Sequence, residues 1–493
     1  MKIKATLFTL ALLLVGNNLF SQIITFRHVF GGTGDDFGQD IEQTSDGGYI
    51  ITGATGSFGY GQSDVYLLKI DSLGIYEWSR SYGGSNIDWG YDVEITSDGG
   101  YVIAGYTNSF GAGGYDFYLI RTDSIGDTLW TKTYGGWDWE HCYSMDITSD
   151  NGYVMVGSTY SYGAGEKDVW IVKTDEFGDT LWTKTFGGIL DDEAKSIKET
   201  FDGDLIVCGG SYTFSDGDSD GLLIRLDSVG NTLWFANYGG PKYAEFNEAV
   251  QLDDTSGFAL FGTNATGATG GTDMYAIKID NIGTITWVKL LGNSLDDWGM
   301  GIDNLPNNRL VFIGSNSIDG GSIESHVFYA NGIQINSIAM AGTKKDEGRA
   351  IKLCDDAGFV ILGNTKSFNF GYSDIIVAKT NQILETDTNL YIEILDTNTI
   401  QYPIPYTSTT EIKKEERSIL LFPNPVSNNQ FTIKANYIIN DVQVFDLLGQ
   451  PIPISIQKSE TAFTILPSSI ISGIYFVEIR TNTKIISKKV IFE

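Results

Sequence analysis

The fold is decided by residues 78–136, which read WSRSYGGSNIDWGYDVEITSDGGYVIAGYTNSFGAGGYDFYLIRTDSIGDTLWTKTYGG. The stretch opens and closes on one pattern, a tryptophan followed five residues later by two glycines: Trp78 with Gly83-Gly84, and Trp130 with Gly135-Gly136. The two glycine pairs are 52 residues apart. Residues 78–136 therefore hold one complete period of an internal repeat.

The same period runs through most of the chain. The glycine pairs and their degenerate relatives are Gly31-Gly32, Gly83-Gly84, Gly135-Gly136, Gly187-Gly188, Gly239-Gly240, Leu291-Gly292 and, after 50 residues, Ala341-Gly342. A turn such as Asp98-Gly99-Gly100-Tyr101 follows each pair, and a Lys/Arg-x-Asp segment such as Arg121-Thr122-Asp123 comes next. Seven copies extend from about Ile24 to Asn381.

Each copy is predicted to form four strands. In the third copy these are residues 144–148, 153–159, 168–174 and 181–186, which are β-rich or alternate between apolar and polar residues. Asp150-Asn151-Gly152 supplies the positive φ of a tight hairpin turn. Seven four-stranded units of this length predict an all-β chain with a seven-bladed β-propeller. A β-helix or solenoid is the alternative, but it would need shorter rungs.

The two ends of the repeat tract predict a closed ring. The first strand, residues 24–30, matches the fourth strand of later copies, whereas the last copy ends on its third strand, residues 374–379. The N-terminal strand can therefore complete the last blade, which hides two sheet edges. These repeats resemble kelch-like and related secreted propeller repeats over about 360 residues. That resemblance implies a fold and no particular activity, because propellers have many functions.

The N-terminus has the order of a secretory signal peptide. A basic start at Lys2 and Lys4 precedes an apolar run over residues 5–16 and a polar stretch ending near Ser21. We expect residues 1–21 to be removed and residues 22–381 to form the propeller. No later segment reaches 18 apolar residues, so we expect no transmembrane segment in the mature protein. The three cysteines are too few for a disulfide framework and are predicted to be buried.

A second module follows the repeats. Residues 382–417 have the composition of a linker, with one strand expected over 390–395. Residues 418–493 are predicted to form a small β-sandwich from the alternation at Val442 and Val444 and at Tyr475, Val477 and Ile479.

This block resembles the type A C-terminal sorting domain of type IX secretion substrates. The matching features are Pro423-Asn424-Pro425, the segment Val442–Gly449, the strand that begins Ser472-Gly473-Ile474-Tyr475, and a basic last strand with Lys488-Lys489. The resemblance implies the type IX secretion machinery as a partner, export through the periplasm across an outer membrane, and removal of the domain during export. It also implies a secreted protein or one anchored to surface lipopolysaccharide.

Composition limits the possible partners. The chain has 62 acidic and 32 basic residues, a net charge of −30, which disfavours binding to nucleic acid and to anionic lipid. Glycine contributes 59 of the 493 residues and aromatic residues 13%, which indicates many short strands and tight turns. We expect a monomer in solution.

Catalytic and metal-binding motifs are scarce. There are three histidines, and His141 is next to Cys142, so the two side chains are expected on opposite faces of a strand and not on one metal. Asp216, Asp218 and Asp220 imitate the start of a calcium loop. A strand is expected to separate them from Asp227, so at most a partial Ca²⁺ site remains. We otherwise expect no cofactor.

Acidic residues follow each glycine pair. They are Asp36, Asp88, Asp138, Glu140, Asp192, Asp296 and Asp346. Pairs of such carboxylates could act as general acid and base on a polysaccharide. Their presence in nearly every copy instead favours a structural role in turns.

The glycine-pair loops and the longer Ser/Thr/Gly loops are expected on one face of the ring, and the short Asp-Gly-Gly and Asp-x-x-Gly turns on the other. Residues that differ between copies gather on the first face: Phe37, Trp89, Trp137, Trp139, Tyr243, Phe246 and Trp298. The expected ligand-binding residues are Trp89, Trp137, Trp139 and Trp298 with Asp88, Asp138 and Glu140, unless the rings pack between blades.

Two classes of function follow. The first is a non-catalytic binding or adhesion module for a glycan or protein ligand, without a catalytic residue. The alternative is an extracellular polysaccharide hydrolase or lyase that uses the acidic loops. Scarce histidine and the absence of a nucleophile motif favour the first class.

Overall fold

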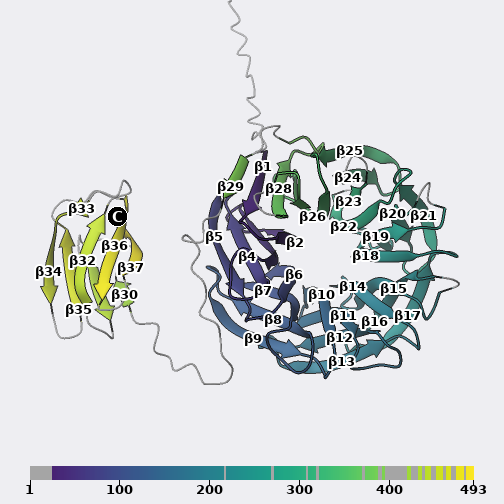
Figure 1. Ribbon diagram of the computed structural model, residues 1–493, viewed down its shortest axis with the longest axis horizontal. Helices are drawn as coiled ribbons and strands as arrows, with labels where there is room; N and C mark the ends of the chain where they lie inside the picture. The colour runs from purple at the N-terminus through teal and green to yellow at the C-terminus, as the bar shows by residue number, and fades with distance from the viewer. Residues whose placement is uncertain are drawn as a thin grey trace, which may run out of the picture. The chain divides into compact units, whose positions relative to one another are not determined.

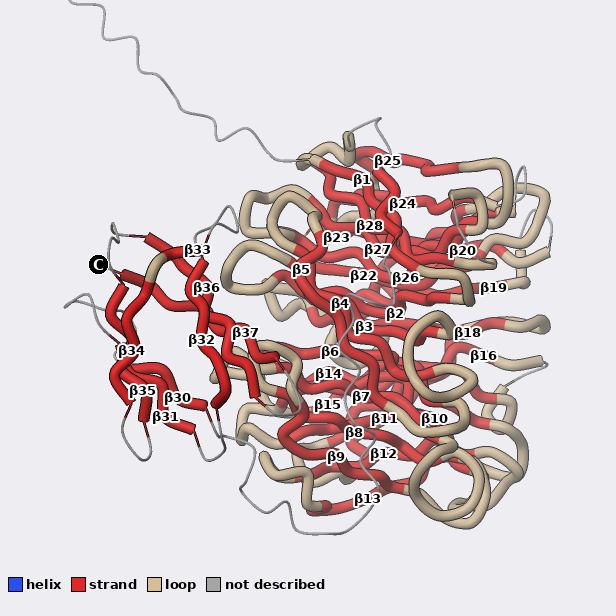
Figure 2. The backbone as a smooth tube through the Cα atoms, turned by 60° about the vertical axis from the view of Figure 1, so that its left-hand side comes forward, coloured by secondary structure: helices blue, strands red, loops and turns tan. Residues whose placement is uncertain are grey.

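The computed structural model describes residues 25–386, with internal gaps at 216–217, 268–270, 307–308, 318–320 and 369–371. It also describes residues 391–394, 419–422, 431–435, 439–445, 451–458, 462–467, 473–481 and 485–492. The predicted signal peptide, Asp216 and most of the predicted linker lie outside these residues. Every element in the described part is a β-strand, as Figure 2 shows. The chain divides into two compact units, Met1–Tyr406 and Thr407–Glu493.

The first unit is a seven-bladed β-propeller, which confirms the predicted fold (Figure 1). Blade one contains β2 (Asp36–Gln43), β3 (Tyr49–Thr55), β4 (Asp64–Ile70) and β5 (Tyr76–Tyr82). Blade two contains β6 (Asp88–Ile95), β7 (Tyr101–Thr107), β8 (Asp116–Thr122) and β9 (Thr128–Tyr134). Blade three contains β10 (Glu140–Ile147), β11 (Tyr153–Thr159), β12 (Asp168–Thr174) and β13 (Thr180–Phe186). Blade four contains β14 (Asp192–Glu199), β15 (Leu205–Ser211), β16 (Asp220–Leu226) and β17 (Thr232–Tyr238). Blade five contains β18 (Ala244–Gln251), β19 (Phe258–Asn264), β20 (Asp273–Ile279) and β21 (Ile285–Leu291). Blade six contains β22 (Trp298–Leu305), β23 (Arg309–Asn316), β24 (Ser322–Tyr329) and β25 (Gln334–Ala341).

The seventh blade closes the ring with the N-terminal strand, as predicted. Its sheet has the order β26 (Asp346–Leu353), β27 (Phe359–Thr365), β28 (Asp374–Thr380), β1 (Phe26–Gly31) and β29 (Tyr391–Ile394). Strand β1 pairs antiparallel with β28, with Phe26 opposite Lys379. Strand β29 is the one expected in the linker, and it pairs parallel with β1 as a fifth strand. The closing contact joins segments that are about 350 residues apart in the sequence.

The hydrophobic core lies between neighbouring blades. The second and third strands are buried along their whole length in blades one, three and seven. The repeated tryptophan belongs to this packing. A Cβ at Gly126, in the Asp-x-x-Gly turn of blade two, would lie 2.7 Å from the Trp78 ring of blade one. Tyr82 Oη of the same blade donates a 2.7 Å hydrogen bond to Gly126 O.

The second unit contains two four-stranded antiparallel sheets. One has the order β30 (Ile419–Phe422), β31 (Phe431–Ala435), β35 (Ala462–Pro467) and β34 (Ile454–Lys458). The other has the order β33 (Pro451–Ile452), β32 (Ile439–Phe445), β36 (Gly473–Thr481) and β37 (Ile485–Phe492). Val442, Val444, Tyr475, Val477 and Ile479 are buried, as their alternation predicted. These strands form the expected small β-sandwich.

In five of the seven blades, a carboxylate at the start of the inner strand ties the loops of one face together. In blade two, Asp88 accepts hydrogen bonds from the backbone N–H of Gly84 at 2.8 Å, from Ser109 Oγ at 2.6 Å and from Thr107 Oγ1. The same carboxylate position in other blades is occupied by Asp36, Glu140, Asp192 and Asp346. We call this set the carboxylate clamps.

The carboxylate clamps explain the first glycine of each pair. A Cβ at Gly83 would lie 2.5 Å from Asp88 Oδ2 and closer still to Asp64 Oδ1. Gly31, Gly135 and Gly187 face equivalent pairs of carboxylates. A side chain at this position would overlap two buried acids, which is why the glycine recurs with the period of the blade.

Gly83→Ala is expected to lower the melting temperature of the full chain, because neither Asp64 nor Asp88 has room to move. The free energy of unfolding should fall by about 1–3 kcal/mol, as it does when a core is overpacked. Gly210→Ala is the matched control, since its Cβ would meet side-chain atoms only, the nearest at 3.1 Å. Thermal unfolding followed by circular dichroism measures both. Equal melting temperatures for the two variants would contradict this role of the first glycine.

Candidate functional site

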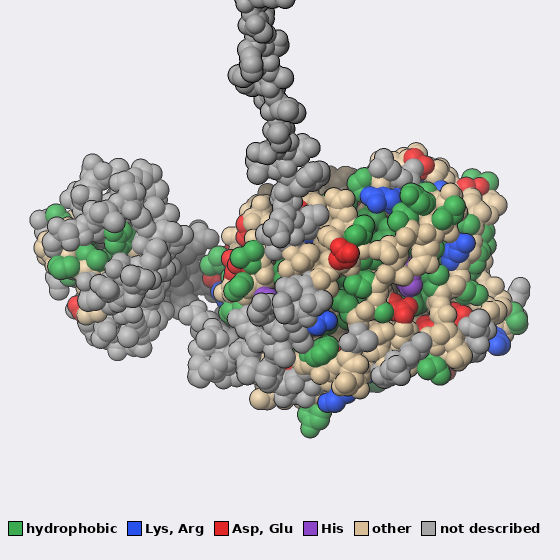
Figure 3. Space-filling view, turned by 90° about the horizontal axis from the view of Figure 1, so that it is seen from above, with side chains coloured by type: hydrophobic (Ala, Val, Ile, Leu, Met, Phe, Trp, Pro, Cys, Tyr) green, Lys and Arg blue, Asp and Glu red, His purple; other side chains and the backbone are tan. Residues whose placement is uncertain are grey.

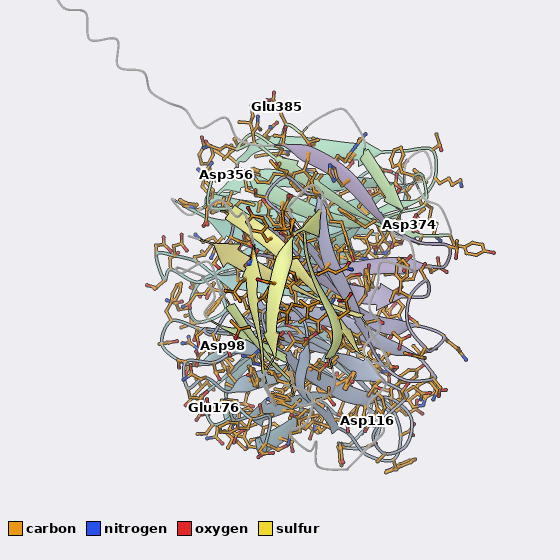
Figure 4. The ribbon with its side chains drawn as sticks, turned by 90° about the vertical axis from the view of Figure 1, so that its left-hand side faces the viewer. Asp98, Asp116, Glu176, Asp356, Asp374 and Glu385 are labelled. Atoms are coloured by element: carbon orange, nitrogen blue, oxygen red, sulfur yellow. The ribbon has the colours of Figure 1, made fainter. Side chains whose placement is uncertain are left out.

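The two faces of the propeller carry different connections. The connections between the second and third strands of a blade and between successive blades lie on one face, which we call the glycine-pair face. The Asp-Gly-Gly and Asp-x-x-Gly turns lie on the other, the short-turn face. Figure 4 shows the ring from its side, with Asp98, Glu176 and Asp356 of short turns toward one face and Asp116 and Asp374 toward the other.

The predicted tryptophans all belong to the glycine-pair face. Trp137 and Trp139, in the loop between β9 and β10, are 75% and 50% exposed. Trp89, the second residue of β6, is half-buried and stacks on Phe37 with 5.3 Å between ring centroids. Trp298 begins β22 and lines the central channel, with Lys345 Nζ 5.9 Å from its ring centroid. Trp137 and Trp139 are thus free to contact a ligand, whereas Trp89 is partly used in packing.

Nine rings of blades one to three form a continuous cluster on this face. We call it the aromatic cluster: Phe37, Trp89, Tyr91, Tyr106, Tyr115, Trp139, His141, Tyr143 and Tyr160. Trp89 and Tyr106 are nearly parallel, with an interplanar angle of 9°. Tyr115 lies between His141 at 5.1 Å and Trp139 at 5.8 Å. The cluster connects the channel wall to the exposed ring of Trp139.

His141 acts as a ring within the aromatic cluster. Its centroid is 4.8 Å from that of Tyr106 in an edge-on contact. Burial lowers the pKa of His141 to about 4, so the imidazole is neutral at pH 7. Cys142 points to the opposite side and is fully buried in the core, as the alternation predicted.

The other half of the channel mouth is charged. Lys195 Nζ lies 3.1 Å from Glu193 Oε1, 3.5 Å from Glu245 Oε1 and 4.2 Å from the centroid of the Tyr143 ring. Lys167 makes a second ion pair with Glu193 at 3.2 Å. Burial opposes ionisation of Glu193, but the charges of Lys195 and Lys167 outweigh it, and its pKa lies below the ordinary value. An aromatic half and a charged half therefore meet at Lys195 and Tyr143.

Two cavities open at this mouth. The mouth pocket, of about 530 Å³, is lined by Glu166, Lys167, Ile189, Leu190, Asp191, Glu193, Gly210, Tyr212, Ser219, Tyr243 and Glu245. The channel cavity, of about 470 Å³, shares Tyr243 and Glu245 with it and continues past Tyr91, Tyr143 and Arg349 to Lys198 and Lys352. A third cavity of about 540 Å³ lies on the short-turn face, beside Trp182, Asp202 and Val229.

Several predicted ligand contacts belong to the scaffold instead. Asp88 and Glu140 are fully buried carboxylate clamps, so the expectation that they lie on a binding surface is wrong. Phe246 is also fully buried and is no surface ring. Asp138 is half-buried in the exposed loop between the two tryptophans, and it remains a candidate.

The sequence does contain a signal for the carboxylate clamps. A hydroxyl residue recurs 19 and 21 residues after the acid: Thr55 and Ser57, Thr107 and Ser109, Thr159 and Ser161, Ser211 and Thr213, and Thr365 and Ser367. The channel residues Glu193, Lys195 and Glu245 were missed. The sequence signal for them is a change of residue type within the repeat. Glu193 and Glu245 stand at the inner-strand position of Phe37 and Trp89, and Lys195 stands at the position of Tyr91.

Asp216, the first residue of the calcium-like motif, lies outside the described residues. Asp218 is exposed, and Asp220 is buried at the start of β16, where it accepts a 3.0 Å hydrogen bond from Gly240 N. Asp227 lies beyond that strand and accepts N–H bonds of its own turn. In the described ranges, no group of three or more His, Cys, Asp or Glu side chains is placed to hold a metal ion.

The described residues contain no helix with the length and hydropathy of a membrane span. On the face shown in Figure 3, hydrophobic, acidic and basic side chains drawn in colour are interspersed.

His141→Phe is expected to make the protein less sensitive to acid. In the unfolded chain His141 takes up a proton near pH 6.5, but in the folded protein only near pH 4, so stability is lost as pH falls between these values. The variant keeps the ring contacts. Its loss in free energy of unfolding between pH 7.5 and pH 4 should be about 1–3 kcal/mol smaller than that of the wild type. The NMR titration of the His141 ring measures its pKa directly. A midpoint near 6.5 would contradict this burial.

Comparison with known proteins gives one specific match. Residues 420–493 match the family described as "Secretion system C-terminal sorting domain". Over 248 residues the chain is 25% identical to "Regulatory protein FlaEY" of Caulobacter vibrioides, an alignment that covers 45% of this chain and 25% of that protein. The chain thus spans about a quarter of the length of this curated relative.

Similarity to solved structures is weak. A puromycin hydrolase has a TM-score of 0.46 at 10% identity, covering 67% of this chain and 50% of that one. BBS1N in complex with ARL6DN has a TM-score of 0.44 at 12% identity, covering 73% and 98%. A protein of unknown function from Bacteroides caccae has a TM-score of 0.38 at 12% identity, covering 57% and 92%. None of these similarities carries a function to this chain, and the likeness to kelch repeats stays a prediction.

The match at the C-terminus confirms the predicted type IX sorting domain, and this domain indicates a secreted or cell-surface protein. The chain is a seven-bladed β-propeller protein that carries a secretion system C-terminal sorting domain at residues 420–493.

Proposed function

We propose that the propeller is a non-catalytic binding module that binds a glycan on its glycine-pair face. The observation that carries the proposal is the aromatic cluster, which runs from the channel wall to the exposed ring of Trp139 and faces charged groups across the mouth. Aromatic rings offer flat apolar surfaces for the C–H faces of a sugar, and carboxylates beside them accept its hydroxyl hydrogens.

The charged half of the mouth supports binding over hydrolysis. A glycoside hydrolase needs one carboxyl group whose pKa is raised, so that it can donate a proton to the leaving group. Glu193 at the mouth has the opposite property, since two lysines keep it ionised, and Glu42, whose pKa burial raises to about 7, is paired with Lys352 in the channel and does not line the mouth pocket. Glu245 shares Lys195 with Glu193, and the Tyr243 hydroxyl donates to Glu245. Both carboxylates of the mouth are therefore held by fixed partners, which suits recognition of hydroxyl groups.

The proposed place of action is outside the cell. The sorting domain supports export by the type IX secretion machinery, and the predicted signal peptide at residues 1–21 supports an earlier step into the periplasm. On this route the sorting domain is removed, and the propeller is left at the cell surface or released.

Replacing Trp137 and Trp139 together with Ala is expected to weaken glycan binding at least tenfold. An exposed tryptophan anchor contributes about 2 kcal/mol or more, and 1.4 kcal/mol is one tenfold step. The melting temperature should stay within a few degrees of wild type, because both rings are at least half exposed. A glycan array identifies a ligand, and calorimetry with that ligand measures the affinity.

The control for this variant is Phe177→Ala, which removes an exposed ring from a short turn on the other face. It should leave the affinity unchanged. Unchanged affinity in the double tryptophan variant would contradict binding of the glycan on the glycine-pair face. Release of shorter sugars from a bound polysaccharide would favour the hydrolase or lyase alternative.

Deleting residues 420–493 is expected to stop export at the periplasm, because the propeller would lose the domain that the secretion machinery binds. Cell fractionation and immunoblotting of the native host locate the truncated chain. The separation of the two compact units suggests that the propeller still folds without this domain. Detection of the truncated chain at the cell surface would contradict the proposed route.

A further inference from the structure

The mouth pocket lies beside Gly210 of blade four, which has no side chain to fill it. Gly210 occupies the penultimate position of β15, opposite Glu193 of β14. In blade two the same position is Tyr106, opposite Trp89, and its ring is part of the aromatic cluster. The missing side chain leaves space above Glu193 and Glu245 that the other blade fills with an aromatic ring. In the remaining blades this position holds Ala54, Ser158, Thr263, Ser315 or Asn364, so blade two alone closes the space with an aromatic ring.

The lining of the mouth pocket is predominantly acidic. Four carboxylates, Glu166, Asp191, Glu193 and Glu245, line it together with a single basic residue, Lys167. Glu193 and Glu245 are already paired with Lys167 and Lys195. Among the described residues, no ion pair involves Glu166 or Asp191, and both reach solvent. Two carboxylates at the entrance are thus free to meet a cationic group.

The channel cavity that adjoins the pocket contains further acids. Seven carboxylates surround its deeper end: Asp40, Glu42, Asp92, Glu94, Asp146, Glu248 and Asp303. Lys198 and Lys352 are the cations among them, with Lys198 3.0 Å from Glu94 and Lys352 2.7 Å from Glu42. Burial and neighbouring carboxylates raise the pKa of Glu42 to about 7 despite Lys352. Burial also raises the pKa of Asp92, Asp146, Glu248 and Asp303, so these acids carry less than full negative charge, and the counter-charge for a cationic ligand has to come from Glu166 and Asp191 at the entrance.

Aromatic side chains complete the pocket. Tyr212 is 40% exposed and Tyr243 is half-buried, and both line the cavity beside the carboxylates. A protonated amine is stabilised by aromatic rings and by ion pairs with carboxylates, whereas an anionic sugar would be repelled. The apolar side chains of Ile189 and Leu190 at the rim can contact the ring carbons of a sugar.

We propose that the mouth pocket binds the protonated amino group of an amino sugar, so that the glycan ligand is cationic. The inference rests on the proposed glycan-binding function and adds the charge class of the ligand. Glu166 and Asp191 supply the counter-charges, and Gly210 supplies the space.

The test compares three hexasaccharides that differ in charge: glucosamine hexamer, N-acetylglucosamine hexamer and galacturonate hexamer. Isothermal titration calorimetry with the full chain at low ionic strength should give at least tenfold tighter binding of the glucosamine hexamer than of its acetylated form. The galacturonate hexamer should not bind measurably. Higher salt should weaken only the binding of the cationic hexamer.

Two variants assign the effect to the pocket. Glu166→Gln combined with Asp191→Asn should reduce the preference for the free amine at least fivefold and leave binding of the acetylated hexamer unchanged. The charge-matched control is Asp253→Asn with Asp355→Asn, two exposed acids in short turns, and it should keep the full preference. Gly210→Tyr should fill the pocket and abolish binding of the glucosamine hexamer.

The outcomes separate the two proposals. Equal affinity for the free and the acetylated hexamer, or an unchanged preference in the Glu166→Gln/Asp191→Asn variant, would overturn the amino-sugar inference and leave glycan binding intact. Tighter binding of the galacturonate hexamer would overturn it as well. Failure of all three hexamers and of every glycan on an array would overturn the proposed function itself.

Discussion

The carboxylate that begins the inner strand in five of the seven blades is the interaction on which the rest of the propeller depends. One buried acid, such as Asp88, accepts hydrogen bonds from a glycine-pair N–H, from a threonine at the end of the next strand and from a serine in the following loop. Two loops and two strands are thereby fixed by a single side chain. Because a buried carboxylate is stable only when its oxygens are satisfied, glycine, threonine and serine recur with it in blade after blade.

This rigid scaffold frees the inner strands to vary where they face the channel. At the second residue of the inner strand, blades one to three carry Phe37, Trp89 and His141, whereas blades four and five carry Glu193 and Glu245. The backbone at these positions is equivalent, so the change of chemistry costs the fold little. The result is a mouth with an aromatic half and a charged half, built on one repeated frame. The proposed binding specificity therefore resides in departures from the repeat.

Much of the candidate face could be predicted, but not which acids it presents. Trp137 and Trp139 are exposed where the spacing placed them. Asp88 and Glu140 were assigned to the same surface because they are near the tryptophans in sequence, yet they are buried. Their partners lie 19 and 21 residues further on, at the end of the neighbouring strand and in the loop after it, and only the folded blade brings them together. Glu193 and Glu245 were overlooked because the channel they share exists only after ring closure.

The sequence by itself determined the seven blades, their strands, the closing partner of β1 and the sorting domain, because these depend on periodicity and on local motifs. Turn residues and alternating side chains act over a few positions, so they can be recognised one repeat at a time. Only the tertiary structure decided which side chains face the channel, how Lys195 joins Glu193 to Glu245 and Tyr143, and where Gly210 leaves a pocket. Those features require neighbouring blades to meet around one axis, and contacts between strands about 50 residues apart leave no local mark in a single copy.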